Sequence, residues 1–278
     1  MRTQLHLALL LPLACLPGCT VPYIPSPITG NWQIQSGSAI TSPPTYPYLV
    51  GALQGTDSAL TGTFSTAQSS TVSPTVESYS GTFNTSTGNL ILNSTAPLPA
   101  GQTIATLSVP ANPTDLSSGT LNIMCGLCAN GQQVQIVGAE IAPLNGTYIG
   151  TLSGTLTTIS PASSTPISGT ASVTFTQSAT PNSSGQFPLT ATVTFPSSSG
   201  MDTATLPGLI SGITVELSTE PCFFPFANYA CNVVGPGSIL IAYTNPTAAQ
   251  ITTTTLYNIS DSNENSVYVS LTGTLTLQ

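Results

Sequence analysis

Threonine or serine alternates with apolar residues over much of this chain, with a period of two. The pattern is clear in 171–176, in 187–195 and in 267–277, and the stretch 251–259 is rich in β-branched residues. Successive residues of a β-strand point to opposite sides, so this alternation predicts half-buried strands. β-branched residues also favour strand over helix. Because helical periodicity is not convincing after residue 19, we expect an all-β fold of antiparallel barrel-like or sandwich units.

A short motif occurs twice in the sequence. Residues 28–32 (Ile-Thr-Gly-Asn-Trp) and 144–148 (Leu-Asn-Gly-Thr-Tyr) share the pattern apolar-x-Gly-x-aromatic, and each is followed by Gly-Thr-apolar units. Self-similarity of this kind indicates repeated structural units. We therefore predict two related β units, at about 28–143 and 144–278. One continuous sheet system built from a common set of short motifs is the alternative.

Residues 1–18 have the layout of a secretory signal. A basic start with Arg2 precedes an apolar run at 7–13. The sequence Leu-Pro-Gly before Cys19 resembles the lipobox of bacterial lipoproteins, in which a small residue precedes a cysteine that is acylated and becomes the mature N-terminus. The resemblance implies lipid attachment at Cys19. An ordinary signal peptide with an incidental cysteine is the alternative, and Cys15 is the rival position.

Residues 19–27 contain three prolines and predict an extended, Pro-rich tether. Eight such residues at about 3.1 Å each would hold the first β unit roughly 25 Å from the lipid. The resemblance to lipoproteins of two-membrane bacteria implies the outer membrane, since position 20 is Thr and not Asp. We therefore expect a lipid-anchored protein of the cell envelope.

Two further resemblances concern the β units. The chain resembles bacterial lipoproteins whose β domains are rich in Thr, Ser and Gly, a likeness that implies no activity. Gly30-Asn31-Trp32 is similar to the Gly-x-Trp motif on the first strand of lipocalins, where the Trp closes one barrel end. This second resemblance implies an up-and-down barrel or a sandwich.

The charge distribution excludes several classes of partner. The chain has one Lys+Arg residue, one His and nine acids, and its formal net charge is −8. Arg2 and His6 both lie in the predicted signal peptide, so cleavage changes the charge from −8 to −9 and leaves no basic side chain. Binding of nucleic acid or phosphate through Lys and Arg is therefore excluded, as is a polybasic membrane patch. The membrane partner is reached only through the lipid on Cys19.

The same lack of basic residues limits catalysis. Nucleophile arrangements that need His or Lys cannot form after cleavage. Carboxylate-only hydrolysis stays chemically open, but Glu216 and Glu220 lie four residues apart on a predicted strand. That spacing is about 13 Å, beyond the roughly 5 to 9.5 Å of a glycosidase pair. We predict no catalytic residue, no cofactor and no enzymatic activity.

Four cysteines remain after the predicted lipid attachment site, and export should oxidise them. Cys125 and Cys128 precede an Asn-Gly turn pair at a predicted hairpin tip. Structural disulfide bonding is the favoured interpretation there, with redox chemistry and metal binding as alternatives. Cys222 and Cys231 bracket a second loop, and closing it would stabilise the fold by roughly 2 to 3 kcal/mol. A zinc site joining the two pairs is not expected, because no His remains.

The loop between Cys222 and Cys231 is rich in aromatic residues. A disulfide-closed loop presents rings to a ligand at low entropic cost. The possible ligand contacts are Phe223, Phe224, Phe226 and Tyr229. The alternative is that these rings fold inward as a lid on the β core.

Acid unfolding requires native carboxylates held by partners, or a net positive charge. Neither condition applies, so we predict a fold almost indifferent to pH between about 2 and 7. The leading functional hypothesis is a non-catalytic, lipid-anchored β protein with a structural or surface-interaction role. A binding module for a small apolar ligand or a neutral glycan is the alternative, and an acid-active carboxylate hydrolase is the third. A deep apolar cavity would favour binding, and a filled core would favour the structural role.

Overall fold

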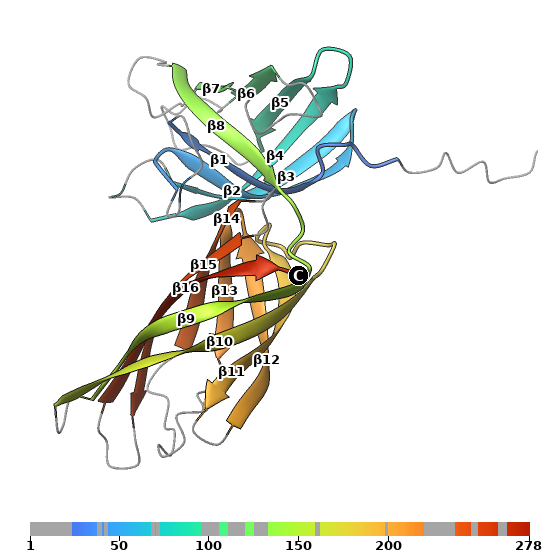
Figure 1. Cartoon of the computed structure of the whole chain (residues 1–278). Coiled ribbons are helices and arrows are strands. Elements are labelled where there is room, and N and C mark those ends of the chain that lie inside the picture. Colours follow the sequence, from blue (N-terminus) through green and yellow to red (C-terminus); the bar gives the residue numbers. More distant parts are fainter. Residues whose placement is uncertain are drawn as a thin grey trace, which may run out of the picture.

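The computed structural model describes residues 24–37, 41, 44–67, 70, 73–95, 106–110, 120–124, 133–158, 162–197, 200–219, 237–245, 250–260 and 266–278. Every regular element within these ranges is a β-strand, which confirms the predicted all-β class. The strands form two closed antiparallel barrels (Figure 1). In the part of the chain that is described, there is no helix long and apolar enough to cross a membrane.

Both barrels follow the chain in simple order. The strands of the first are β1 (Gly30–Ser36), β2 (Tyr48–Thr56), β3 (Ala59–Ala67), β4 (Thr75–Asn84), β5 (Asn89–Ser94), β6 (Thr106–Pro110), β7 (Thr120–Met124) and β8 (Gln133–Ile141). Those of the second are β9 (Gly146–Thr158), β10 (Ser163–Gln177), β11 (Phe187–Ser197), β12 (Gly200–Ser211), β13 (Thr214–Thr219), β14 (Gly237–Asn245), β15 (Gln250–Ser260) and β16 (Ser266–Leu277).

Each barrel is closed by its own first strand. β1 pairs with β2 on one side and with β8 on the other, where Asn31 lies opposite Ile141. β9 pairs in the same way with β10 and β16. The topology is therefore up-and-down, and closure protects the edges that Thr-rich strands would otherwise leave open.

The interior of the first barrel holds one cluster of buried side chains. Trp32 and Ile34 of β1 are 2% and 0% exposed. Phe64 of β3 meets Tyr79 of β4 edge to face, with ring centroids 5.6 Å apart. The other members of the cluster are Ile28, Leu49, Leu53, Leu60, Phe83, Leu90 and Leu92. An eight-stranded barrel is just wide enough for side chains to fill in this way.

In the second barrel the predicted alternation is confirmed where side chains are described. Val173 and Phe175 of β10 are buried, and Thr174 between them is exposed. The inward residues of β11 from Phe187 to Val193 are buried as well. The Phe195 side chain and those of 267–271 lie outside the described part.

The repeated motif places an aromatic side chain at the same position in both barrels. Gly30 and Gly146 are the first residues of β1 and β9, and Trp32 and Tyr148 are 2% and 1% exposed. Gly146 has φ 103°, and a Cβ at this residue would lie 2.7 Å from Cδ1 of Leu277. The glycine thus leaves room for Leu277, which ends β16 and is 44% exposed although the alternation predicts an inward position.

The predicted tether ends earlier than the sequence suggests. Residues 1–23, with the predicted signal peptide and Cys19, lie outside the described residues. Ser26 is 2% exposed, and its backbone N–H donates to the carbonyl of Gly55 at 2.9 Å. Because Ser26 packs against β2, any spacer ends by this residue and not at 27.

Candidate functional site

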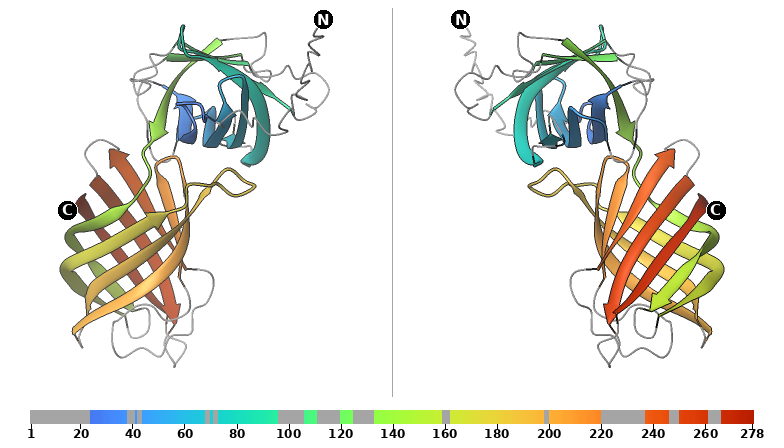
Figure 2. Two further views of the ribbon diagram at one scale, coloured as in Figure 1. Left: turned by 90° about the vertical axis from the view of Figure 1, so that its right-hand side faces the viewer. Right: turned by 90° about the vertical axis from the view of Figure 1, so that its left-hand side faces the viewer.

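One end of the second barrel lies against the outer face of the first (Figures 1 and 2). The turn between β12 and β13 meets β1 there, and side chains of β2 and β8 extend the contact. We call this contact the barrel seam. It comprises Asn31, Gln33, Ala52, Ala139 and Ile141 of the first barrel and Gly212 and Ile213 of the second.

Asn31 is the central polar residue of the barrel seam. Its Nδ2 donates to the carbonyl of Gly212 at 2.8 Å, and its Oδ1 accepts from the N–H of Gly212 at 2.7 Å. The side chain is 2% exposed. The amide of Asn31 therefore bonds the turn as a neighbouring strand would, and it leaves neither backbone group of Gly212 unpaired.

Gln33 and Gln35 continue this polar row along β1. Oε1 of Gln33 accepts from the N–H of Ile213 at 3.1 Å, and its Nε2 donates to Oε1 of Gln35 at 2.6 Å. Nε2 of Gln35 donates in turn to Oγ1 of Thr41 at 2.9 Å and of Thr45 at 3.0 Å. Both glutamines are at most 1% exposed. Neutral amides thus supply buried donors in a chain that has no Lys, Arg or His after His6.

The apolar part of the barrel seam joins the core of the second barrel. Ala52, Ala139 and Ile141 of the first barrel are 1%, 8% and 2% exposed. They belong to the same buried cluster as Tyr148 and Phe175 of the second. Because one apolar cluster spans both barrels, a movement of one barrel against the other would expose core surface to water.

A crevice of about 190 Å³ opens beside the barrel seam. Three parts of the chain enclose it: the segment before β1, the adjoining ends of β1 and β2, and the connection from β10 into β11. The lining residues are Pro25, Thr29, Gly30, Leu53, Gln54, Gly55, Ala179, Pro181 and Phe187. This wall carries no ionisable side chain.

A carboxyl group lies beside Gly30, on the inner face of the first barrel. Glu140 of β8 pairs with Trp32, so both side chains project from the same face of the sheet. Its Oε1 lies 2.9 Å from the point that a Cβ of Gly30 would occupy. Glu140 keeps contact with solvent, yet neighbouring protein atoms partly desolvate it and raise its pKa above the ordinary glutamate value.

A second acid lies inside the first barrel, on β4. Oε2 of Glu77 accepts from the hydroxyl of Tyr79 at 2.9 Å, and its Oε1 accepts from Oγ1 of Thr75 at 3.3 Å. Tyr79 is 5% exposed. Burial, and then the adjacent Glu77 carboxylate, raise the pKa of Tyr79 far above its ordinary value, so this phenol stays protonated as a donor.

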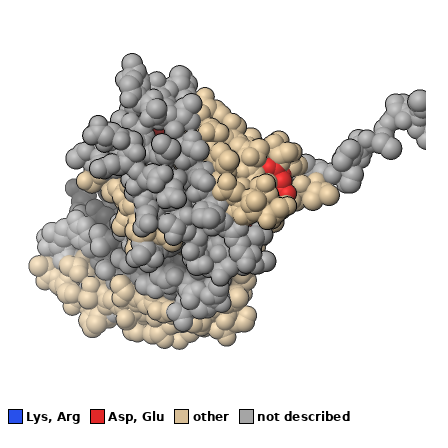
Figure 3. Space-filling model, turned by 90° about the horizontal axis from the view of Figure 1, so that it is seen from above, with Lys and Arg blue, Asp and Glu red and all other residues tan. Residues whose placement is uncertain are grey.

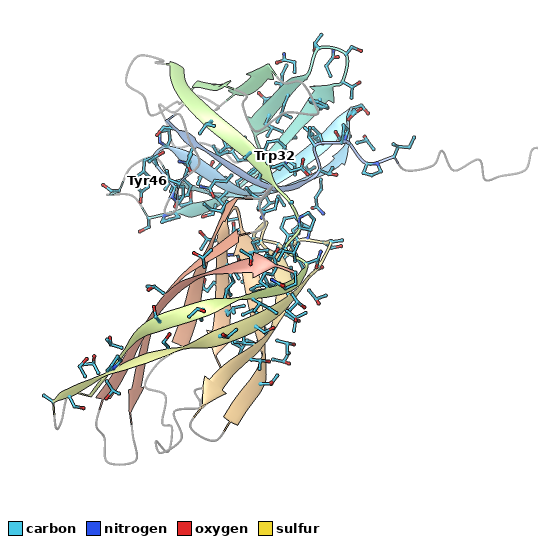
Figure 4. All side chains as sticks on the ribbon, in the orientation of Figure 1. Trp32 and Tyr46 are labelled. Atoms are coloured by element: carbon cyan, nitrogen blue, oxygen red, sulfur yellow. The ribbon has the colours of Figure 1, made fainter. Side chains whose placement is uncertain are left out.

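A pair of tyrosines, of which Tyr46 is exposed and Tyr48 is half-buried, lies at the rim of the first barrel. The rings of Tyr46 and Tyr48 are 5.3 Å apart and tilted by 43°, and Tyr46 is 41% exposed. Figure 4 shows Tyr46 at the outer edge of the barrel and Trp32 within it. The backbone N–H of Ser36 donates to the carbonyl of Pro47 at 2.9 Å, which fixes the connection that carries the pair.

Most of the described surface is uncharged. On the face drawn in Figure 3, acidic side chains occupy small areas and the other described residues are neutral. Glu216 on β13 is exposed, as the sequence predicts, and Glu220 lies outside the described residues.

We expect the thermal midpoint of the full chain to stay constant or rise slightly on acidification from pH 7 to pH 4. The pKa of Glu140 is higher in the folded than in the unfolded state, so the folded state binds its proton more readily. The stability gained from that proton is complete when the pH is below the pKa of Glu140 in the unfolded state. It is lost as the pH rises through the pKa of Glu140 in the folded state. Calorimetry at pH 4, 5.5 and 7 measures this, with Glu140→Gln as the variant that removes the rise. A midpoint that falls steeply on acidification would contradict the prediction.

The site residues predicted from sequence lie outside the described part of the chain. These residues are Cys19, Cys125, Cys128, Cys222, Cys231, Phe223, Phe224, Phe226 and Tyr229. The strands that flank the two cysteine loops are described: β7 pairs with β8, and β13 pairs with β14. Each loop therefore connects two antiparallel neighbours.

No three His, Cys, Asp or Glu side chains gather to hold a metal ion among the described residues. Comparison of the chain with protein-family models and with curated proteins gave no match. The case for a function therefore rests on the fold, the barrel seam and the crevice beside it.

Proposed function

We propose that this chain is a non-catalytic, lipid-anchored protein of the cell envelope, in which two barrels act as one rigid body with a structural or surface-interaction role. The barrel seam is the main support for a rigid body, because the buried amides of Asn31 and Gln33 form hydrogen bonds with the turn at Gly212 and Ile213. The apolar cluster that spans both barrels supports the same proposal. The uncharged polar contacts keep their hydrogen bonds at any pH that the envelope meets.

The proposed location rests on the N-terminal sequence. The signal layout and the motif ending at Cys19 support cleavage, acylation and attachment to the outer membrane. Cleavage would remove Arg2 and His6, and the absence of other basic residues supports a non-catalytic role without a nucleic-acid partner.

Replacement of Cys19 by Ala tests this location. In a two-membrane bacterium, we expect the unaltered chain in the membrane fraction and Cys19→Ala in the soluble envelope fraction, because a lipid anchor cannot form without the thiol. Cys15→Ala is the matched control and should stay in the membrane fraction. Intact mass should show loss of residues 1–18 and addition of lipid. Retention of those residues, or of Cys19→Ala in the membrane, would contradict the proposal.

A second candidate function is a binding module for a small apolar ligand or a neutral glycan. The crevice beside the barrel seam offers a small hollow to the apolar ligand, with Phe187 and Pro181 in its wall. The exposed ring of Tyr46, packed against the half-buried ring of Tyr48, favours the glycan, because tyrosine offers rigid amphipathic contact area. The acid-active hydrolase stays third, and the exposed position of Glu216 adds nothing in its favour.

A further inference from the structure

The described part of the chain begins at the crevice beside the barrel seam. Pro25 belongs to the crevice wall, and the backbone N–H of Ser26 donates to the carbonyl of Gly55 at 2.9 Å. Because Ser26 is 2% exposed, the chain is fixed to the first barrel from this residue on. Ile24, two residues earlier, is 71% exposed. A large apolar side chain is thus presented to solvent on the crevice side of the molecule.

The second barrel contributes an arm to the same side. The arm is the connection between β10 and β11, residues 178–186, and its Ala179 lines the crevice. Figure 2 shows the arm, in yellow, projecting from the second barrel next to the first. The N–H of Gly185 donates to the carbonyl of Asn182 at 3.0 Å and closes the turn of the arm. A Cβ at Gly185 would lie 2.0 Å from the carbonyl oxygen of Thr63, so the arm rests on β3.

The predicted lipid attachment site is close to this side in the sequence. Cys19 precedes Ile24 by five residues, and an extended chain spans at most about 3.6 Å per residue, so its reach is about 18 Å. β10, with 15 residues, is about 50 Å long at 3.3 Å per residue. A lipid on Cys19 would therefore keep the crevice side near the membrane, while the opposite end of the second barrel can point away from it.

The charges favour the same orientation. The start of β12 and the connections β13–β14 and β15–β16 lie at the end of the second barrel opposite the barrel seam, because the strand order is up-and-down. Four of the nine acids belong to these parts of the sequence: Asp202, Glu220, Asp261 and Glu264. An anionic lipid surface repels that end. Of the acids nearer to the crevice, Asp57 is half-buried and Glu140 faces the interior of the first barrel.

We propose that the crevice side of the molecule lies against the membrane that holds the lipid on Cys19. We call this surface the membrane face. Its exposed side chains are apolar or neutral, namely Ile24, Pro25, Gln54, Ala179 and Thr180. Burial of apolar area in the interfacial region of a bilayer adds to membrane affinity. This inference rests on the proposed lipid anchor and names the surface that meets the membrane.

Quenching of an added Trp by lipids brominated in their acyl chains tests this contact. The lipidated full chain is placed in vesicles of phosphatidylethanolamine and phosphatidylglycerol, with and without brominated lipid. Ala179→Trp puts the probe on the arm. Ala162→Trp is the matched control, because it puts the probe on an exposed turn at the other end of β10. Bromine quenches only near contact, so we expect the emission of the added Trp to be lost in Ala179→Trp and kept in Ala162→Trp. Trp32 is buried and common to both variants, and its emission shows that each is folded.

An acid on the membrane face should undo the contact. Ile24→Asp, added to Ala179→Trp, places a carboxylate against anionic lipid, so we expect the quenching to be lost while the chain stays anchored. Ser164→Asp adds the same charge at the exposed far end of β10 and should leave the quenching intact.

Two results in an anchored chain would overturn the membrane face: equal quenching of the two probes, or quenching that Ile24→Asp does not change. The second result would show that the short tether alone keeps the arm near the lipid. A chain whose intact mass lacks the lipid would overturn the anchor and the membrane face together, so the two failures are distinguishable.

Discussion

Replacement of Trp32 by Ala is expected to lower the free energy of unfolding by about 3 to 5 kcal/mol, the usual cost of truncating a large buried side chain. Trp32 is 2% exposed and lies in the buried cluster inside the first barrel. Its Nε1 also donates to the carbonyl of Ile28 at 2.8 Å, which holds the segment before β1 in place. Urea unfolding measures this loss. It is followed by circular dichroism and not by Trp fluorescence, because the variant lacks the one Trp of the chain.

Trp32→Phe separates packing from hydrogen bonding. It keeps most of the ring but leaves the buried carbonyl of Ile28 without its donor, so we expect a loss of about 1 to 3 kcal/mol. Tyr46→Ala is the control for loss of an aromatic ring at an exposed position and should cost under about 1 kcal/mol. Equal losses for Trp32→Ala and Tyr46→Ala would show that Trp32 is not part of the core.

The fold could be predicted well from the sequence, because one physical rule generates it. In 171–176 and 187–193 the alternation of Thr or Ser with apolar residues identifies strands and their inward faces, and the structure confirms both. The choice between barrel and sandwich could not be made from this pattern. The choice depends on whether the last strand of a unit pairs with its first strand. Alternation within one strand does not show which strands pair.

The barrel seam could not be predicted in the same way. Asn31, Gln33 and Gln35 alternate with Trp32 and Ile34, as the outer face of a strand does in water. The period of two tells which side of the sheet a residue occupies, but not that another barrel or a connection covers that side. Three uncharged amides on one strand face were the available signal, since amides can be buried with full hydrogen bonding where Lys or Glu is seldom tolerated.

The crevice could not be predicted from the sequence either, because its lining residues at 25–30, 53–55 and 179–187 lie far apart in the chain. These residues come together only because one end of the second barrel lies against the outer face of the first. The sequence predictions for the cysteines and for the aromatic loop at 223–229 stay predictions, since those residues lie outside the described part.

Asn31→Asp should lower the free energy of unfolding by about 3 to 5 kcal/mol at pH 7, the cost of an uncompensated buried charge. The two side chains have nearly the same shape, so the effect is electronic. A carboxylate can accept from the N–H of Gly212, as Oδ1 of Asn31 does, but it cannot donate to the Gly212 carbonyl that now receives Nδ2. With its central contact weakened, the barrel seam should open first, and one calorimetric transition should become two.

Acid should rescue this variant. A protonated carboxyl group has one O–H donor and one free acceptor, so it can restore both bonds to Gly212. The pKa of the new Asp is then higher in the folded than in the unfolded state. The loss of unfolding free energy caused by Asp is therefore absent below its unfolded-state pKa of about 3.9. This loss grows as the pH rises through the folded-state pKa of the same group. We expect the stability difference from the unaltered chain to fall below about 1 kcal/mol near pH 3.

Asn84→Asp is the matched control for the barrel seam. Oδ1 of Asn84 accepts from the N–H groups of Ser86 and Thr87 in an exposed turn, a role that a carboxylate also fills. Its effect should stay within about 0.5 kcal/mol at both pH values. Asn31→Asp could instead behave like this control, with no loss of unfolding free energy at pH 7 and no recovery of it in acid. The amide of Asn31 would then be in contact with water, and the two barrels would not be held together by hydrogen bonds at β1.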